Sequence, residues 1–315
     1  MTNNINKKSN PSSKKLHPRS LHKNKYDFNQ LIKVLPELAK HTKPNPAGEI
    51  TIDFNNNESV VLLNKALLKL HYDINFWDIP TGYLCPPIPS RADYVHHLAD
   101  LISDNDKIKV GKTVNILDIG TGANAIYPII GATIYGWKFT ASDINPISIK
   151  TVTAISQLNK NLAGLIKPIL QKNPNAIFDG VIAPTDYFAA TMCNPPFHAS
   201  AEDATFANVN KQKKLAKNKT KKSGIHNKSV IKSQLNFGGQ NAELWCAGGE
   251  IKFLTQMINE SVKYKRQVGW FTSLVSKKAN VAALKKLLQK RQAKNIKIIT
   301  MQHGQKQTRI IAWQF

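Results

Sequence analysis

The residues best suited to chemistry are Asn194-Pro195-Pro196-Phe197, which follow a short apolar run typical of a buried strand. Two prolines fix the backbone there, so the Asn194 amide oxygen and the Pro195 carbonyl can both accept hydrogen bonds from one small NH2 group. A nucleobase amine is a poor nucleophile because its lone pair is delocalised into the ring. Accepting both of its protons favours the pyramidal geometry that attack on a sulfonium methyl requires, and Phe197 can stack on the base. The motif therefore predicts a clamp for a planar amine, against the alternative of a proline turn that only closes a strand.

A glycine-containing loop, Asp118-Ile119-Gly120-Thr121-Gly122-Ala123-Asn124-Ala125, is the second candidate. Glycine lets a cofactor approach the backbone more closely than a Cβ allows. The loop also satisfies a loose dinucleotide fingerprint, and a purely structural strand-to-helix turn is a further alternative. A carboxylate at Asp118 would repel a pyrophosphate and suit an ammonium group, which favours S-adenosylmethionine. We therefore expect Asp118, Gly120 and Gly122 to bind that cofactor.

Asp143 is the third candidate, at the tip of the next expected strand and 23 residues beyond Gly120. A carboxylate there can accept hydrogen bonds from two ribose hydroxyls, which holds for nicotinamide and S-adenosyl cofactors alike. The alternative is a charge that the dipole of the helix beginning at Pro146 favours. Asp143 is therefore predicted to bind a cofactor, but its position does not distinguish between the two cofactor classes.

The sequence gives little support for a metal site or for a nucleophilic catalytic residue. The three cysteines, Cys85, Cys193 and Cys246, are widely separated, and no Cys or His pair has the spacing of a zinc site. We expect reduced thiols and no metal. His198 is interpreted as an incidental loop histidine. No general base is evident, and none is needed if water takes the proton late.

The charge of the chain points to a polyanionic partner, with nucleic acid as the first candidate. Lys and Arg number 44 against 20 Asp and Glu, a formal net charge of +24. Seven of the basic residues lie in 1–26 and seven more in 211–222. We interpret both blocks as mobile, solvated arms that contact phosphates, against the alternative of a solubility tail or localisation signal. Self-repulsion favours a monomer, and the lack of a secretory signal or apolar span indicates a cytoplasmic protein with no membrane partner.

Strands and helices are expected to alternate after residue 105. This pattern predicts an α/β protein of Rossmann-like architecture, with a mainly parallel twisted sheet, helices on both faces and ligands at the carboxyl ends of the strands. We expect a basic disordered arm at 1–25, an accessory RNA-binding helical region at 26–105, and a catalytic domain at 106–315 with a Lys-rich insertion at 205–233. The predicted strands are 114–119, 138–143, 166–170, 188–193, 268–275, 296–301 and 308–315, and the predicted helices after residue 105 are 125–135, 147–161, 251–262 and 281–291.

Together the loop at 118–125, Asp143 and Asn194–Phe197 resemble class I S-adenosylmethionine methyltransferases that modify planar amines, whose substrates include adenine N6, guanine N2 and glutamine N5. From about His22 to the end, the chain resembles bacterial 23S ribosomal RNA adenine-N6 methyltransferases of the RlmF type. That family is in turn similar to a eukaryotic adenine-N6 methyltransferase of spliceosomal small nuclear RNA and messenger hairpins. The phrases that carry the resemblance are Pro86–His96, Leu117–Gly131, Cys193–Ser200, Leu235–Gln240, Glu243–Cys246 and Gly248–Glu250.

The resemblance implies a class I methyltransferase fold, S-adenosylmethionine as cofactor, and an adenine of large-subunit ribosomal RNA as substrate. The target base should be unpaired or flipped out of its stack. Alternatives are methylation of another planar amine such as guanine N2, a nicotinamide-dependent oxidoreductase, and a noncatalytic RNA-binding assembly factor. The family roles implied are Arg91 at the methionine carboxylate, Gly120 at the methionine part, Asp143 at the ribose, Asn173 near the adenosyl group, and Asn194, Pro195, Pro196 and Phe197 around the adenine. For Arg91, a salt-bridged arginine at a helix start is the alternative.

Overall fold

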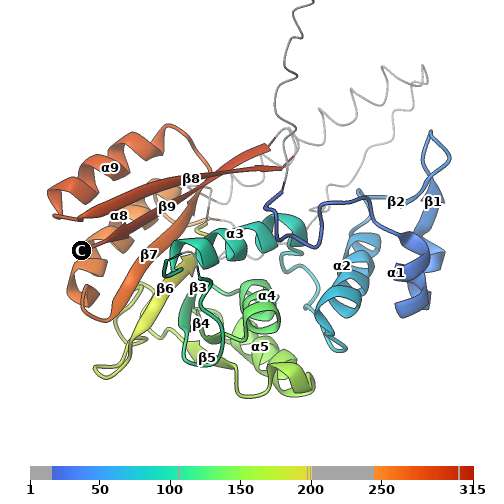
Figure 1. Ribbon diagram of the computed structural model, residues 1–315, viewed down its shortest axis with the longest axis horizontal. Helices are drawn as coiled ribbons and strands as arrows, with labels where there is room; N and C mark the ends of the chain where they lie inside the picture. Colours follow the sequence, from blue (N-terminus) through green and yellow to red (C-terminus); the bar gives the residue numbers. More distant parts are fainter. Residues whose placement is uncertain (1–15, 106, 197, 199, 201–244, 304–305) are drawn as a thin grey trace, which may run out of the picture.

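A seven-stranded sheet forms the centre of the protein (Figure 1), here a computed structural model that describes residues 16–105, 107–196, 198, 200, 245–303 and 306–315. Neighbouring strands are parallel from one edge as far as β7, and β9 is antiparallel to both of its neighbours. The mainly parallel sheet expected from the sequence is therefore confirmed. The strands in spatial order are β5 (Ile166–Leu170), β4 (Lys138–Asp143), β3 (Asn115–Ile119), β6 (Phe188–Cys193), β7 (Val268–Val275), β9 (Lys306–Gln314) and β8 (Asn295–His303).

The order of the strands fixes where a ligand can bind. From β3 the chain runs outward through β4 to β5, and then returns to the other side of β3 to form β6. The direction of winding thus reverses between β3 and β6. Sheets of this kind leave a crevice at such a reversal, outside the carboxyl ends of the strands.

Helices cover both faces of the sheet. Successive strand residues point to opposite faces, so Ile116 packs in one core cluster and Leu117 in the other. The Ile116 side packs against helices α3, α4 and α5, and the Leu117 side against α8 and α9. The helices of these layers are α3 (Ile88–Leu101), α4 (Ile126–Tyr135), α5 (Pro146–Leu158), α8 (Gly249–Ser261) and α9 (Asn280–Lys290), with short 3-10 turns at Lys160–Leu162 and Val262–Tyr264.

The N-terminal elements share a core with the sheet. Buried residues of the first helices, such as Leu31 and Leu67, belong to the same cluster as Ile116 and Ile310. These elements are α1 (Phe28–Val34), a 3-10 turn at Pro36–His41, the antiparallel pair β1 (Thr42–Pro44) and β2 (Ile50–Ile52), and α2 (Asn57–Tyr72). The described helices include none with the length and apolar content that crossing a membrane demands.

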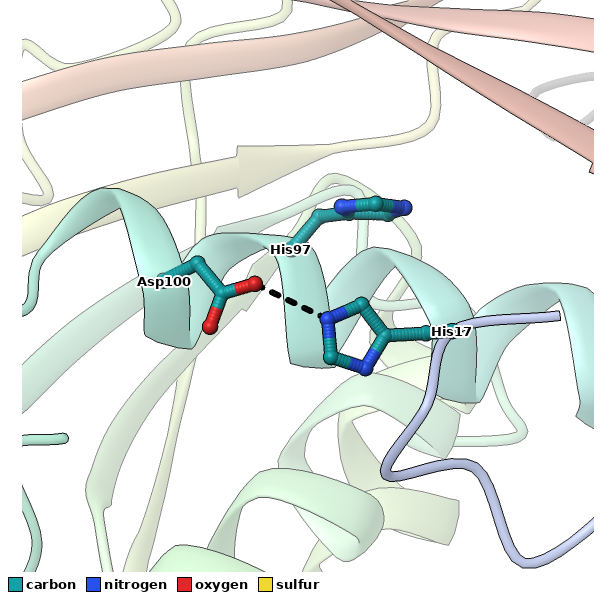
Figure 2. Close-up of side chains that lie close together, drawn as sticks. All are labelled: His17, His97 and Asp100. Atoms are coloured by element: carbon teal, nitrogen blue, oxygen red, sulfur yellow. Dashed lines mark hydrogen bonds and ion pairs between the residues drawn. The ribbon is translucent and has the colours of Figure 1, made fainter. Parts of the chain in front are cut away.

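Residues 16–25 correct the expectation of a disordered arm over 1–25. His17 and His22 are buried, at 7% and 5% exposure. The His17 Nε2 lies 2.8 Å from an Asp100 oxygen on α3 (Figure 2), and the Arg19 guanidinium also donates to Asp100. His17 and Arg19, which the local sequence suggested were exposed to solvent, thus bind an acidic residue far along the chain. Residues 1–15 and the Lys-rich insertion at 205–233 lie outside the described residues.

Candidate active site

A cavity of about 320 Å³ lies at the carboxyl ends of β3, β4 and β6. Its volume is at the lower end of the range typical of small-molecule sites, roughly 300–1,000 Å³. The cavity lies where the winding of the sheet reverses. Seven of the residues expected from the sequence line it, namely Arg91, Gly120, Gly122, Asp143, Asn194, Pro195 and Pro196.

The glycine loop after β3 presents bare backbone to this cavity. Gly120 and Gly122 adopt left-handed backbone angles, with φ of +68° and +64°. The Gly120 and Thr121 N–H groups donate to the Ser142 carbonyl at 2.9 and 3.0 Å, which ties the loop to the end of β4. A Cβ built on Gly120 would meet no atom within 4 Å. The loop therefore leaves open space where a bound molecule can approach the main chain.

Asp143 joins the glycine loop to the next loop. Its Oδ2 accepts from the Gly122 N–H and its Oδ1 from the Asn145 N–H, both at 2.8 Å. Burial raises the pKa of the Asp143 carboxyl, while these backbone N–H groups act in the opposite direction. Each carboxylate oxygen keeps a second lone pair. The side chain can thus hold the loop and still accept from a ligand hydroxyl.

Asp118 lies within β3, one residue short of the loop in which it was expected. It is 1% exposed, and neither carboxylate oxygen makes a hydrogen bond of normal geometry among the described residues. Burial raises the pKa of this carboxyl to about 7, the charge of Asp143 adds to the effect, and Thr121 and Arg91 oppose it. Asp118 does not line the cavity. It is a buried, unsatisfied acid behind the loop that a nearby cation would stabilise.

Arg91 enters the cavity from the first turn of α3. Pro87 and Pro89 fix the start of this helix, and the Arg91 guanidinium carbon lies 5.7 Å from the centroid of the Tyr127 ring. The aromatic contact orients the guanidinium while leaving its N–H donors available. Arg91 is thus a cationic donor on the same wall as the glycine loop.

One helical turn further, Tyr94 connects α3 to β7 and to β6, the strand that precedes the proline motif. Its hydroxyl lies 2.7 Å from Thr272 Oγ1, and the Cys193 N–H points to it at 3.4 Å. The Thr272 hydroxyl already donates to the Thr191 carbonyl at 2.6 Å, so Tyr94 must be the donor to Thr272. This buried chain of hydrogen bonds fixes the end of β6.

Asn194 follows β6 directly. Its Oδ1 is buried and has no hydrogen-bond partner among the described residues. Pro195 and Pro196 continue along the wall of the same cavity, and Phe197 lies outside the described residues. Burial also raises the pKa of the neighbouring Cys193 thiol, which argues against a nucleophilic role. The site thus offers an unpaired oxygen acceptor beside the glycine loop.

Asn173 does not line the cavity. Its Oδ1 accepts from the Asn175 N–H at 3.0 Å, and its own N–H donates to Gln171 Oε1 at 2.8 Å. Gln171 and Asn175 line the cavity instead. Gln171 follows β5 just as Asp143 ends β4, so the strand-end argument could have found it.

The α8 side of the cavity was also missed from the sequence. Glu260 accepts from the N–H groups of Ile177, Phe178 and Asp179 at 2.8–2.9 Å, and so holds a loop of the cavity wall against α8. No local motif marks these residues as part of a site, because the chain returns to it from far away. The additional lining residues on and before α8 are Trp245, Cys246, Ala247, Lys252, Phe253 and Gln256.

A separate group of possible metal ligands lies outside the cavity, where the first described residues pack on the last turns of α3. Ligand atoms of His17, His97 and Asp100 lie within 4.8 Å of one another (Figure 2). The His17 Nδ1 accepts the Arg19 N–H at 3.1 Å, so its Nε2 carries the proton and donates to Asp100. A metal on that Nε2 would require this pattern to change. The observed contacts hold residues 16–25 on α3.

Comparisons with known proteins agree with this geometry. A family model described as RNA methyltransferase matches residues 10–315. The ribosomal RNA large subunit methyltransferase F of Psychrobacter sp. (strain PRwf-1) is 55% identical over 308 residues, covering 97% of this chain and 94% of that protein. The protein of the same name from Vibrio cholerae serotype O1 (strain M66-2) is 50% identical over 300 residues, covering 95% and 83%.

Solved structures are similar over nearly the whole chain. The hMettl16 catalytic domain in complex with MAT2A 3′UTR hairpin 1 has a TM-score of 0.77 at 26% identity, covering 96% of each chain. The N-terminal domain of human METTL16 in complex with SAH has a TM-score of 0.71 at 25% identity, covering 96% of this chain and 99% of that one. These matches confirm the class I methyltransferase fold and the resemblance expected from the sequence. The chain belongs to the RNA methyltransferase family.

Proposed function

We propose that the protein transfers a methyl group from S-adenosylmethionine to the N6 amine of an adenine in large-subunit ribosomal RNA. The observation that carries the proposal is the buried, unpartnered Asn194 oxygen in the cavity that Gly120 also lines. An acceptor without a partner beside an open backbone cradle suits an amine held next to a cofactor. The names of the relatives from Psychrobacter and Vibrio support ribosomal RNA as the substrate.

The cofactor side of the cavity fits a cationic molecule with a ribose. S-adenosylmethionine supplies an electrophilic methyl group on a positively charged sulfur. Gly120 admits the methionine part, Arg91 binds its carboxylate, and Asp143 accepts from the ribose hydroxyls. The unsatisfied carboxyl of Asp118 contributes negative charge behind the loop. The SAH complex of the METTL16 domain supports this choice.

The substrate side prepares the amine for attack. The Asn194 amide oxygen and the Pro195 carbonyl accept the two N6 protons and favour a pyramidal nitrogen. As the new bond forms, positive charge develops on that nitrogen, and the same two oxygens stabilise it. The amine becomes acidic as the methyl arrives, so water can take the proton late. Phe197 stacks on the adenine in this proposal, although it lies outside the described residues.

The surrounding assignments belong to the same proposal. Residues 26–105 serve as an accessory RNA-binding region and 106–315 as the catalytic domain, acting as a cytoplasmic monomer without a metal. The formal charge of +24 supports contact with RNA phosphates.

The test is methyl transfer from labelled S-adenosylmethionine to undermodified large-subunit RNA, followed by mass mapping of the product. Asn194→Ala should lower the rate about 10²–10³-fold, the usual cost of removing a donor or acceptor aimed at developing charge. Gln289→Ala, which removes an exposed amide on α9 away from the cavity, is the matched control and should keep full activity. Undiminished labelling by Asn194→Ala would refute the clamp. A methyl group on guanine N2, or RNA binding without transfer, would refute the assigned reaction.

A further inference from the structure

Besides Asn194, three residues that line the cavity have a buried side-chain polar atom without a hydrogen-bond partner among the described residues, namely Thr121, Tyr127 and Trp245. Trp245 is the one that the chain places beside the proline motif. The indole Nε1 of Trp245 is buried and has no hydrogen-bond partner among the described residues, and Trp245 lines the cavity. Buried indole N–H groups usually have a partner. Those of Trp77, Trp137 and Trp313 in this protein donate to Asn124 O, Lys109 O and Ser261 Oγ. Among the described residues, the Trp245 N–H is therefore a donor without an acceptor.

The backbone places Trp245 beside the proline motif. Trp245 forms a parallel bridge with His198, and the Cys246 N–H donates to the His198 carbonyl at 3.1 Å. His198 is four residues beyond Asn194. This pairing thus holds Trp245 next to the residues that directly follow Asn194 and Pro195.

The start of α8 makes this placement rigid. Glu250, in the first turn, is 1% exposed and accepts from the Ser276 and Lys277 N–H groups and from the Asn280 amide. A carboxylate with three donors holds the helix to the end of β7. The Gly249 N–H, at the start of this helix, donates to the Cys246 carbonyl at 2.8 Å, so the residue after Trp245 is bonded to the anchored end of α8. Recognition of a base edge requires support of this kind.

The Asn194 oxygen and the Trp245 indole N–H are together complementary to one edge of adenine. Asn194 offers an acceptor and Trp245 a donor in the same cavity. Adenine carries the N6 donor next to two ring-nitrogen acceptors, N1 on one side and N7 on the other. We propose that the Trp245 indole N–H donates to one of these ring nitrogens while Asn194 accepts from N6, which makes Trp245 a residue that determines base specificity. This inference rests on the proposed function.

The pairing explains how the site rejects guanine in the same orientation. Guanine has an O6 acceptor where adenine has its amine, and this oxygen would face the Asn194 oxygen. On the N1 side it would also direct an N–H at the indole N–H. Buried polar groups left without partners discriminate strongly against a wrong substrate.

The experiment uses the full-length protein, S-adenosylmethionine and large-subunit RNA with adenosine, 1-deazaadenosine or 7-deazaadenosine at the target. Wild type should lose about tenfold in kcat/KM on whichever analogue lacks the contacted nitrogen. Trp245→Phe should lose about tenfold on adenosine and lose nothing more on that analogue, because the contact is already absent. Trp313→Phe removes a buried indole N–H outside the cavity and should keep the wild-type response to both analogues.

Three results would overturn the inference. The first is wild-type kcat/KM unchanged by both analogues, a result that does not depend on how any variant folds. The second is full activity of Trp245→Phe on adenosine. The third is a further loss of kcat/KM when Trp245→Phe acts on either analogue in place of adenosine, as large as the loss that the wild type shows on that analogue. Binding of S-adenosylmethionine to Trp245→Phe, measured by calorimetry, should match wild type. Failure of the wild type to methylate adenosine would instead refute the proposed function itself.

Discussion

The buried acid behind the glycine loop should make the stability of the free protein depend on pH. Burial raises the pKa of the Asp118 carboxyl from its ordinary 3.8 to about 7. The folded state therefore binds the proton more tightly than the unfolded chain does. The stability that this proton contributes is complete below about pH 4 and is lost as the pH rises through 7. At about 1.36 kcal/mol per pKa unit, ionisation of Asp118 costs ~4 kcal/mol at pH 8.

Asp118→Asn isolates this cost, because asparagine has nearly the same shape and does not ionise. At pH 5 the wild type has lost only about a third of the stability at stake, and at pH 8 it has lost all of it. The free energy of unfolding of Asp118→Asn minus that of wild type should therefore be ~3 kcal/mol higher at pH 8 than at pH 5, which means that the variant gains stability relative to wild type as the pH rises. Urea unfolding at both pH values, without cofactor, measures this difference, and groups that titrate equally in both proteins cancel.

An equal difference between the two proteins at pH 5 and pH 8 would refute the reasoning, since it would mean that Asp118 ionises at an ordinary pKa in the folded protein. A difference that grows toward pH 5 would refute it more strongly. That result requires a folded-state pKa below the unfolded one, which needs hydrogen bonds to the carboxylate that the structure lacks among its described residues.

Three further substitutions test parts of the site and its support. Gly120→Ala should weaken S-adenosylmethionine binding at least tenfold by calorimetry, because a φ of +68° strains alanine and the new Cβ enters the cavity. The control Gly164→Ala has a similar φ of +70° but lies outside the cavity, so it should lose stability and keep its affinity for the cofactor. Glu260→Gln should lower the free energy of unfolding by about 1–3 kcal/mol in urea, because three backbone N–H groups lose a charged acceptor; an unchanged midpoint would contradict that role. Asp100→Asn should speed amide hydrogen exchange in residues 16–25, and unaltered exchange would show that the segment is held by other contacts.

The strands that position the site could be predicted because local sequence marks both of their ends. β6 is an apolar run closed by Asn194-Pro195-Pro196, and β3 ends at a glycine loop. Residues that directly follow such strands must gather at one edge of a parallel sheet. This rule places Gly120 and Asp143 in one cavity with Asn194, and it would also have identified Gln171.

The remaining features depend on contacts between distant segments. His17 and Arg19 belong to a basic stretch, and partners on α3 and α4, more than 70 residues away, explain why this stretch is packed. Trp245 enters the cavity by pairing with His198, 47 residues earlier. Neither pairing leaves a periodic or compositional signal. Asp118 shows a further limit of prediction from sequence. The sequence identifies an acid near the loop, but it does not reveal that this acid is buried and has no hydrogen-bond partner among the described residues.

Helix α3 extends from the cavity to the N-terminal stretch at 16–25. It is 14 residues long, or ~21 Å at the usual rise, with Arg91 at its start and Asp100 near its end. A shortened version of the protein that begins after residue 25 would therefore free the far end of α3 and alter the reach of Arg91. A truncated protein intended to keep full activity should therefore retain residues 16–25, which pack on α3.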